Sequence, residues 1–365
     1  MPSGMVVVGW NDRVGTVLKG KYPDTVDLSP DLTMKIYGSH VLGEQREAGF
    51  ISMKVGELNI ASYFGGIEVN HYVSVILKPD EDAPEFESAL TRVAGEIFAK
   101  LEKDEFMKDL PSLYRHLATF PTFTEEQRLA YIFADAKTRA ALQYLSEVGS
   151  ASKEELADIL RDRLDLKSVS IEPVLQPLVR AGLVVTEWVE GIPSECVFLV
   201  QDSMPVLTPP ASMLRLADAG SIPEPKRYLK AVNSFFQAEP AILPEDRRAP
   251  VAELLVDPDA YEVLKLLRNG VLNEAALTAQ TKLAPDVMTG LLKRLHSAHV
   301  AVEEKETGWY LVADPQMITS FPEYLIGTAI SRYNKKEVVP RQAARYLSLL
   351  REQFKHQLVT SKASG

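Results

Sequence analysis

An internal repeat occupies the C-terminal two thirds of this 365-residue chain. The stretch LQPLVRAGLVV, which starts at Leu175, matches LKRLHSAHVAV, which starts at Leu292. Two further blocks keep the same order: FLVQD at Phe198 matches YLVAD at Tyr310, and Tyr228-Leu229 before Phe236 matches Tyr346-Leu347 before Phe354. Three separated blocks in register indicate a duplication, so each copy must be one structural unit.

Each copy carries the hydrophobic pattern of a winged helix, in which helical spacing gives way to a two-stranded hairpin. In the first copy we expect helices at Arg139–Val148, at Lys153–Arg163 and up to Gly182, then strands at Leu183–Val189 and Cys196–Val200. In the second we expect helices at Ala260–Arg268, Asn273–Thr281 and Pro285–His296, then strands at Val300–Glu304 and Trp309–Val312. A helical extension follows each hairpin, and we expect each extension to pack on its own copy.

The N-terminal third has a different pattern, with five strand signals and three helix signals in the order β-β-α-β-β-β-α-α. The strands are expected at Met5–Trp10, Gly15–Lys19, Gly49–Val55, Asn59–Phe64 and His71–Leu77. This element order resembles that of the longin and roadblock domains. The resemblance implies a single five-stranded antiparallel sheet and a non-catalytic docking platform for small GTPases or trafficking complexes.

The predicted fold class is therefore α+β, with a longin-like sheet domain followed by two winged-helix repeats with helical extensions. The longin-like domain is expected at 1–125, the first repeat with its extension at 126–238 and the second at 251–358. A proline-rich linker is expected at 239–250 and a disordered tail at 359–365.

DNA reading by the winged helices is disfavoured by charge, since it requires cations at base edges and phosphates. The wing of the first copy carries Glu187, Glu190 and Glu195, and the wing of the second carries Glu303, Glu304 and Glu306. Tandem winged helices resemble the protein-docking modules of endosomal-sorting, polymerase and proteasome-lid subunits. We therefore expect an adaptor or regulatory scaffold with protein partners, one of them a small GTPase; a DNA-associated transcriptional regulator is the alternative.

Composition and motifs favour a non-enzymatic, soluble, cytoplasmic protein. The formal net charge is −10, the only cysteine is Cys196, and no segment has the roughly 18 apolar residues of a membrane span. The opening residues lack the basic stretch of a signal peptide, and the phosphate-binding, hydrolase and zinc-protease motifs are missing from the sequence. The pair His296 and His299 lacks further ligands, so we expect no metal, no cofactor and no catalytic residue.

The C-terminus reverses the charge balance of this acidic chain. From Arg332 to Lys362 the basic residues outnumber Glu337 and Glu352, and Ala344, Leu347, Leu350 and Phe354 are spaced for one helix face. One interpretation is a helix with its apolar side on the second copy and its cations in water. The other is a docking surface for an acidic partner (a protein, anionic lipid or nucleic acid) formed by Lys335, Lys336, Arg341 and Arg345.

Overall fold

The computed structural model describes residues 1–41, 48–101, 105–166, 168–238, 243–304 and 306–363, with side chains up to Gln357. The chain divides into two compact units, Met1–Phe123 and Thr124–Gly365. Each unit is described below by itself.

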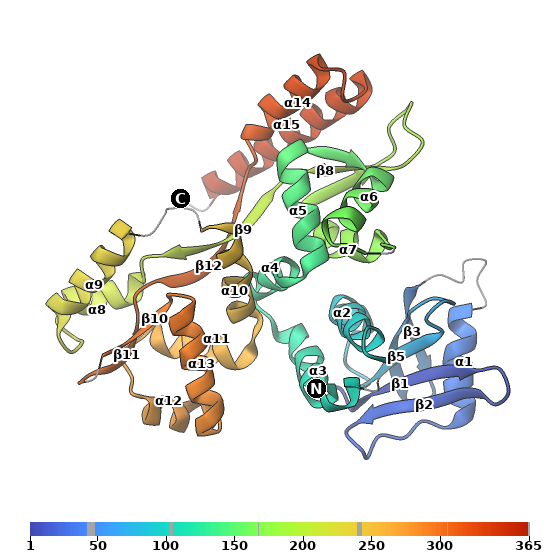
Figure 1. Cartoon of the computed structure of the whole chain (residues 1–365), viewed down its shortest axis with the longest axis horizontal. Helices are drawn as coiled ribbons and strands as arrows, with labels where there is room; N and C mark the ends of the chain where they lie inside the picture. The colour runs from blue at the N-terminus through green and yellow to red at the C-terminus, as the bar shows by residue number, and fades with distance from the viewer. Residues whose placement is uncertain (42–47, 102–104, 167, 239–242, 305, 364–365) are drawn as a thin grey trace. The chain divides into compact units, whose positions relative to one another are not determined.

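The N-terminal unit is built on one antiparallel sheet of five strands (Figure 1). The strands are β1 (Gly4–Asn11), β2 (Gly15–Tyr22), β3 (Gly49–Val55), β4 (Leu58–Phe64) and β5 (His71–Leu77), in the order β2-β1-β5-β4-β3. This confirms the predicted α+β class and the predicted N-terminal sheet. The edges of the sheet are β2 and β3, whereas β1 is buried along most of its length because it lies in the interior of the sheet.

Helices cover both faces of this sheet. Strand alternation directs Val6 and Val8 to one face, where they pack with Ile36 of α1 (Pro30–Val41). Helices α2 (Glu87–Phe98) and α3 (Leu110–Thr119) follow the sheet in sequence, and Figure 1 shows α1 and α2 on opposite sides of it.

In the C-terminal unit the same series of elements occurs twice. The first copy has α4 (Glu125–Ala134), α5 (Ala136–Val148), β6 (Ser150–Ser152), α6 (Lys153–Arg163), α7 (Glu172–Arg180), β7 (Val184–Glu187) and β8 (Cys196–Leu199). The second has α10 (Glu245–Val256), α11 (Pro258–Leu267), α12 (Glu274–Thr281), α13 (Pro285–Ser297), β10 (Ala301–Glu304) and β11 (Gly308–Leu311). Strand β6 pairs with β8; in the second copy a single bridge from Leu272 to Trp309 takes its place.

A long antiparallel ribbon joins the two copies. Strand β9 (Asp202–Thr208) pairs with β12 (Asp314–Ser320), so that the first residue of each strand lies opposite the last residue of the other. Two helices follow each strand, and we call each helix pair an arm. The first arm is α8 (Ala211–Asp218) with α9 (Pro225–Ala238), and the second is α14 (Tyr324–Asn334) with α15 (Pro340–Ala363).

The arms are exchanged between the copies, so the expectation that each extension packs on its own copy is wrong. Tyr228 of α9 packs on Tyr310 of the second copy, and Tyr346 of α15 packs near Phe198 of the first. Figure 1 shows α9 beside the β10–β11 hairpin and α15 beside β8. The exchange follows from the ribbon, because antiparallel strands that pass one another carry the following helices to opposite ends.

Three further expectations need correction. Residues 245–250 of the expected linker form the start of α10, which packs against α4; residues 239–242 lie outside the described part. The expected disordered tail is wrong for 359–363, since α15 continues to Ala363, and 364–365 are not described. The apolar face of α15 also differs from the expected one. Its buried residues are Ala343, Tyr346, Leu349 and Leu350, whereas Ala344 and Phe354, which were expected on that face, are exposed.

Candidate docking surface

Arg345 does not face solvent as a free cation. Its guanidinium donates two hydrogen bonds, of 2.5 and 2.6 Å, to the carboxylate of Glu187 on β7. These hydrogen bonds are the largest cause of the lowered pKa of Glu187, and partial burial opposes them. The same contact raises the pKa of Arg345. A bidentate contact of this kind fixes the orientation of the guanidinium as well as its distance from the carboxylate. It therefore holds α15 against the first hairpin.

Arg341 makes a second contact of this type one turn earlier on α15. It forms an ion pair with Glu190, which lies in the turn between β7 and β8. Both side chains are more than half exposed, so this pair contributes little stability by itself. The four basic residues selected from the sequence therefore separate into two groups, and the two arginines contact the chain's own glutamates.

Lys335 and Lys336 form the second group, at the C-terminal end of α14. Their backbone amides close the helix by donating to the carbonyls of Ser331 and Tyr333. Lys336 has a positive φ of 61°. Both lysines are exposed, and in the part of the chain with described side chains neither has an ion-pair partner. They are the members of the predicted docking surface that are available to another molecule.

An exposed apolar face on α14 was missed by the sequence analysis. Ile326, Ile330 and Tyr333, which we call the α14 stripe, are 37%, 47% and 48% exposed. Their spacing of four and three residues places them on one helix face. The neighbouring Arg332 points inward instead, where it donates to the carbonyl of Ser150 at 2.7 Å. The spacing of these three residues is visible in the sequence, but they lie mostly before the basic segment that starts at Arg332.

A second exposed surface lies on the N-terminal unit, along edge strand β2 and helix α1. We call it the β2–α1 edge. Its exposed apolar side chains are Val14, Leu18 and Met34, of which Val14 is 70% exposed. The ideal Cβ position of Gly15 is 2.5 Å from the end of Met34, so strand and helix meet there. Each of these side chains has a basic sequence neighbour, and none of the three neighbours has an ion pair among the described residues: Arg13, Lys19 and Lys35.

Each hairpin of the C-terminal unit carries a glutamate that forms an ion pair with an arginine of the exchanged arm. Glu304 of β10 pairs with Arg227 of the exchanged arm at 3.0 Å, as Glu187 pairs with Arg345 in the first copy. Arg294 on α13 pairs with Asp257 at 2.6 Å. These arginines are therefore held by carboxylates of the same chain.

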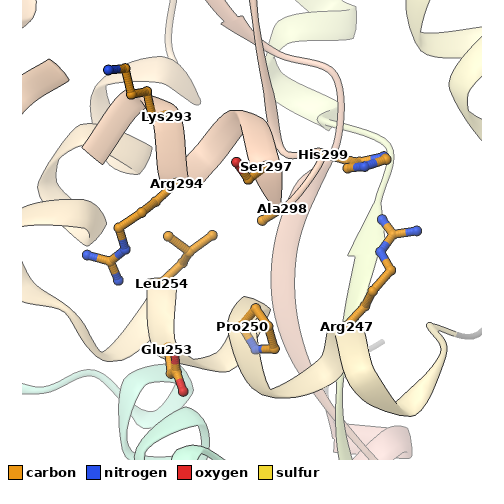
Figure 2. Close-up of a pocket in the computed structure, with 9 residues that line it drawn as sticks. All are labelled: Arg247, Pro250, Glu253, Leu254, Lys293, Arg294, Ser297, Ala298 and His299. Atoms are coloured by element: carbon orange, nitrogen blue, oxygen red, sulfur yellow. The ribbon is translucent and has the colours of Figure 1, made fainter. Parts of the chain in front are cut away.

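A pocket of about 470 Å³ lies between α10 and α13 (Figure 2). Figure 2 shows Arg247 and His299 on one side of it and Arg294 on the other, with Pro250 and Leu254 between them. Arg294 is already paired with Asp257. The pocket is thus lined by several basic side chains, and at least one of them is paired with a carboxylate of the chain.

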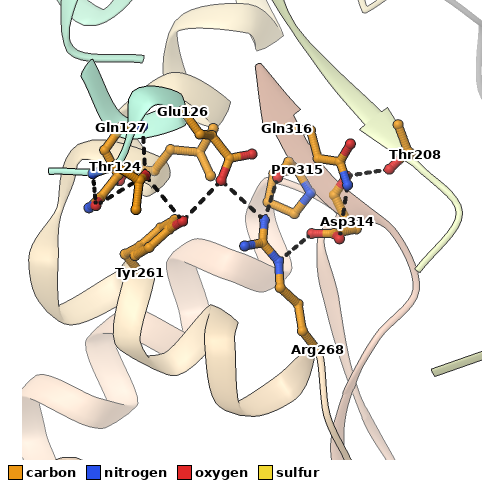
Figure 3. A network of polar contacts seen from close by, with 10 residues as sticks. Thr124, Glu126, Gln127, Thr208, Tyr261, Arg268, Asp314, Pro315 and Gln316 are labelled. Carbon is orange, nitrogen blue, oxygen red and sulfur yellow. Dashed lines mark hydrogen bonds and ion pairs between the residues drawn. The ribbon is translucent and has the colours of Figure 1, made fainter. Parts of the chain in front are cut away.

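A polar network fastens the ribbon to the helices around it (Figure 3). Arg268 donates to Asp314 at 2.8 Å and to the carbonyl of Pro315 at 2.9 Å. Burial alone would lower the pKa of Arg268, but the charges of Asp314 and Glu126 outweigh burial and raise it. Tyr261 donates to Glu126 at 3.1 Å, which ties α11 to α4. The network is structural, because its charges are paired with each other.

Two reactive side chains elsewhere, those of Cys196 and His40, are buried. Burial raises the pKa of the Cys196 thiol to about 11, so it stays protonated and unreactive at neutral pH. His40 lies 2.8 Å from Ser62 in the N-terminal core, and burial lowers its pKa to about 4. His296 contacts the carbonyl of Ala301. In the described part of the chain, no three His, Cys, Asp or Glu side chains are grouped as metal ligands would be.

No protein-family model matches the sequence, and no curated protein matches it. Among the helices described, none has both the length and the apolar character needed to cross a membrane.

Proposed function

We propose that this chain is a non-catalytic adaptor that binds a protein partner along the β2–α1 edge of its N-terminal unit. The observation that carries the proposal is the combination, on a sheet edge, of exposed Val14, Leu18 and Met34 with neighbouring basic residues that have no ion pair in the described part of the chain. Large exposed apolar side chains that lie together favour a protein interface. The cations favour a partner with an acidic surface, because complementary charge accelerates association.

The resemblance to longin and roadblock domains makes a small GTPase the partner to test first. Element order and the five-stranded sheet support this resemblance. By fold-level analogy, such a domain is a docking platform. The winged-helix interpretation of the two copies is part of the same proposal, and the helix–strand–helix–helix–hairpin order of the first copy supports it.

The charges of the C-terminal unit support docking of protein over reading of DNA. A DNA-binding winged helix needs several cations free to replace counterions at phosphates. Here Arg294, Arg227 and Arg345 are each paired with a carboxylate of the chain. Paired in this way, the three arginines are not free to replace counterions at phosphates.

A capture experiment tests the proposal. The full chain, cross-linked in extracts of its source cells, should capture a small GTPase, and Leu18→Asp with Met34→Asp should abolish capture. Leu58→Asp is the matched control. Leu58 is 37% exposed in the same unit, but it begins β4, which lies near the edge of the sheet opposite to β2. Capture that survives the double substitution contradicts the β2–α1 edge.

A salt titration with duplex DNA distinguishes the adaptor from the alternative function, a DNA-associated transcriptional regulator. A DNA-associated regulator would bind duplex DNA with an affinity that falls steeply as salt rises. The adaptor proposal predicts no binding at 50 to 200 mM salt. Over this range a protein with six or more phosphate contacts loses roughly 10³-fold or more in affinity. Measurable, salt-sensitive binding would replace the proposed function with the alternative.

A further inference from the structure

The second arm has a surface that the first arm lacks. Helix α14 has 11 residues and α15 has 24, against 8 in α8 and 14 in α9. In the first arm, Leu214 packs against a buried cluster around Tyr228. Its sequence counterpart in the second arm is Ile326, which is 37% exposed. Since the two arms share an origin, the longer helix and its exposed apolar face are specific to the second copy.

The exposed face of α14 is apolar and open. Between Tyr324 and Asn334 the only charged residue is Arg332, which points into the fold. Gly327 lies on the exposed side, and a Cβ built on it would meet nothing within 4 Å. A small residue between Ile326 and Ile330 lets the backbone of another helix come close.

The ends of this face carry opposite charge. Glu323 is exposed at the N-terminal end, and Lys335 and Lys336 are exposed at the C-terminal end. None of the three has an ion-pair partner in the described part of the chain. At a rise of about 1.5 Å per residue, Glu323 and Lys336 are about 20 Å apart along the axis, with Ile330 near the midpoint.

Such a face is complementary to itself. If two copies of α14 run antiparallel, Ile326 of each lies against Tyr333 of the other, and Ile330 lies near its own counterpart. In the same register Glu323 of each copy comes beside Lys336 of the other. A two-fold symmetric contact requires this property, because each copy presents the same patch.

We propose that two copies of this chain form a symmetric dimer by antiparallel packing of α14 through the α14 stripe. One helix face is smaller than the roughly 800 Å² per partner of a standard interface. The dimer is therefore weak and concentration-dependent, with a dissociation constant in the micromolar range. The inference does not depend on the proposed function, because self-association is measured on the purified chain alone.

Sedimentation velocity on the purified full chain, from low micromolar to several hundred micromolar, tests the dimer. The wild-type chain should shift from monomer to dimer over this range. Ile330→Asp should keep it monomeric at every concentration. Val287→Asp on α13 is the matched control, since Val287 is 41% exposed on a helix of the same unit, and it should not change the dissociation constant.

A charge exchange tests the antiparallel register. Glu323→Lys and Lys336→Glu should each raise the dissociation constant about threefold to tenfold, because each places like charges together twice in the symmetric dimer. The double variant should return it to near the wild-type value. A monomeric wild type at several hundred micromolar, or a dimer unaffected by Ile330→Asp, overturns the proposal; single reversals that the double variant does not rescue overturn the antiparallel arrangement.

Discussion

The hydroxyl of Tyr346 donates a hydrogen bond of 2.8 Å to the carbonyl oxygen of Leu199. Tyr346 lies on the last helix of the second copy, whereas Leu199 ends the hairpin of the first. The equivalent tyrosine of the first arm makes the reciprocal contact, from Tyr228 to the carbonyl of Leu311 at 3.1 Å. The two copies are therefore joined by exchange of their arms, and neither hairpin is covered without the other copy.

Removal of either tyrosine hydroxyl should lower the stability of the folded chain by a similar amount, because the two exchanged arms make equivalent contacts. Tyr346→Phe and Tyr228→Phe should each lower the free energy of unfolding by about 1 kcal/mol, since each loses one buried hydrogen bond. Tyr346→Ala should cost about 3–5 kcal/mol because it also empties a packed site. Urea unfolding of the full chain measures this, with the half-exposed Tyr333→Phe as control. No change in either Phe variant would show that the exchanged contacts do not stabilise the fold.

The pair of Glu187 and Arg345 should make the C-terminal unit sensitive to acid. The pKa of Glu187 is lowered in the folded chain, so its stabilisation is present above the ordinary value of about 4.3 and is lost as pH falls through the lowered value. Each side chain is about one third exposed, so the coupling energy should be only about 0.5–1 kcal/mol.

A double-mutant cycle with Glu187→Gln and Arg345→Ala, at pH 7 and at pH 3, measures that coupling. The cycle on Asp158 and Arg161, which are 64% and 45% exposed, is the control and should give a smaller value. An equal coupling at both pH values would contradict the pH assignment.

His40 should destabilise the N-terminal unit at acidic pH. Its pKa is about 4 when folded and about 6.5 when unfolded, so the unfolded state takes up the proton first. Stability is complete above pH 6.5, and it falls as pH drops towards 4, by on the order of 3 kcal/mol at pH 4. Urea unfolding followed by Trp10 fluorescence measures it, because Trp10 stacks on Tyr37 in this unit. His40→Gln should flatten the profile between pH 6.5 and 4; an unchanged slope would assign the effect to other groups.

The repeat predicts equal costs at equivalent core positions. Leu178 on α7 and Leu295 on α13 are both completely buried. Replacement of either by Ala should lower the free energy of unfolding by about 2–5 kcal/mol. The neighbouring Val179 is 42% exposed, so Val179→Ala should have an effect within about 0.5 kcal/mol. Near-neutral effects at both leucines would remove the equivalence.

Local features were predictable because they depend on neighbours in the chain. The strands expected at Met5–Trp10 and Gly15–Lys19 form the first hairpin of the sheet, which the structure confirms. The helix expected at Lys153–Arg163 is present, and Ser152 caps it by accepting a hydrogen bond from the amide of Glu155. The winged-helix and longin interpretations stay predictions.

The candidate site was predictable only in part. The sequence located Lys335, Lys336, Arg341 and Arg345 as a basic segment, but it could not tell which of them would meet a carboxylate. The β2–α1 edge was missed because its side chains come from a strand and a helix that the sheet brings together.

By itself the sequence determined the duplication, the positions of the hairpins and which residues of most helices are apolar, since these follow from register and spacing. Only the tertiary structure decided which copy each arm covers and which arginines are paired. Spacing shows that a helix such as α15 has a side to bury, but many surfaces can satisfy that requirement. The ribbon of β9 with β12 selects one of them, because its antiparallel hydrogen bonds direct Tyr346 to Leu199 and Arg345 to Glu187.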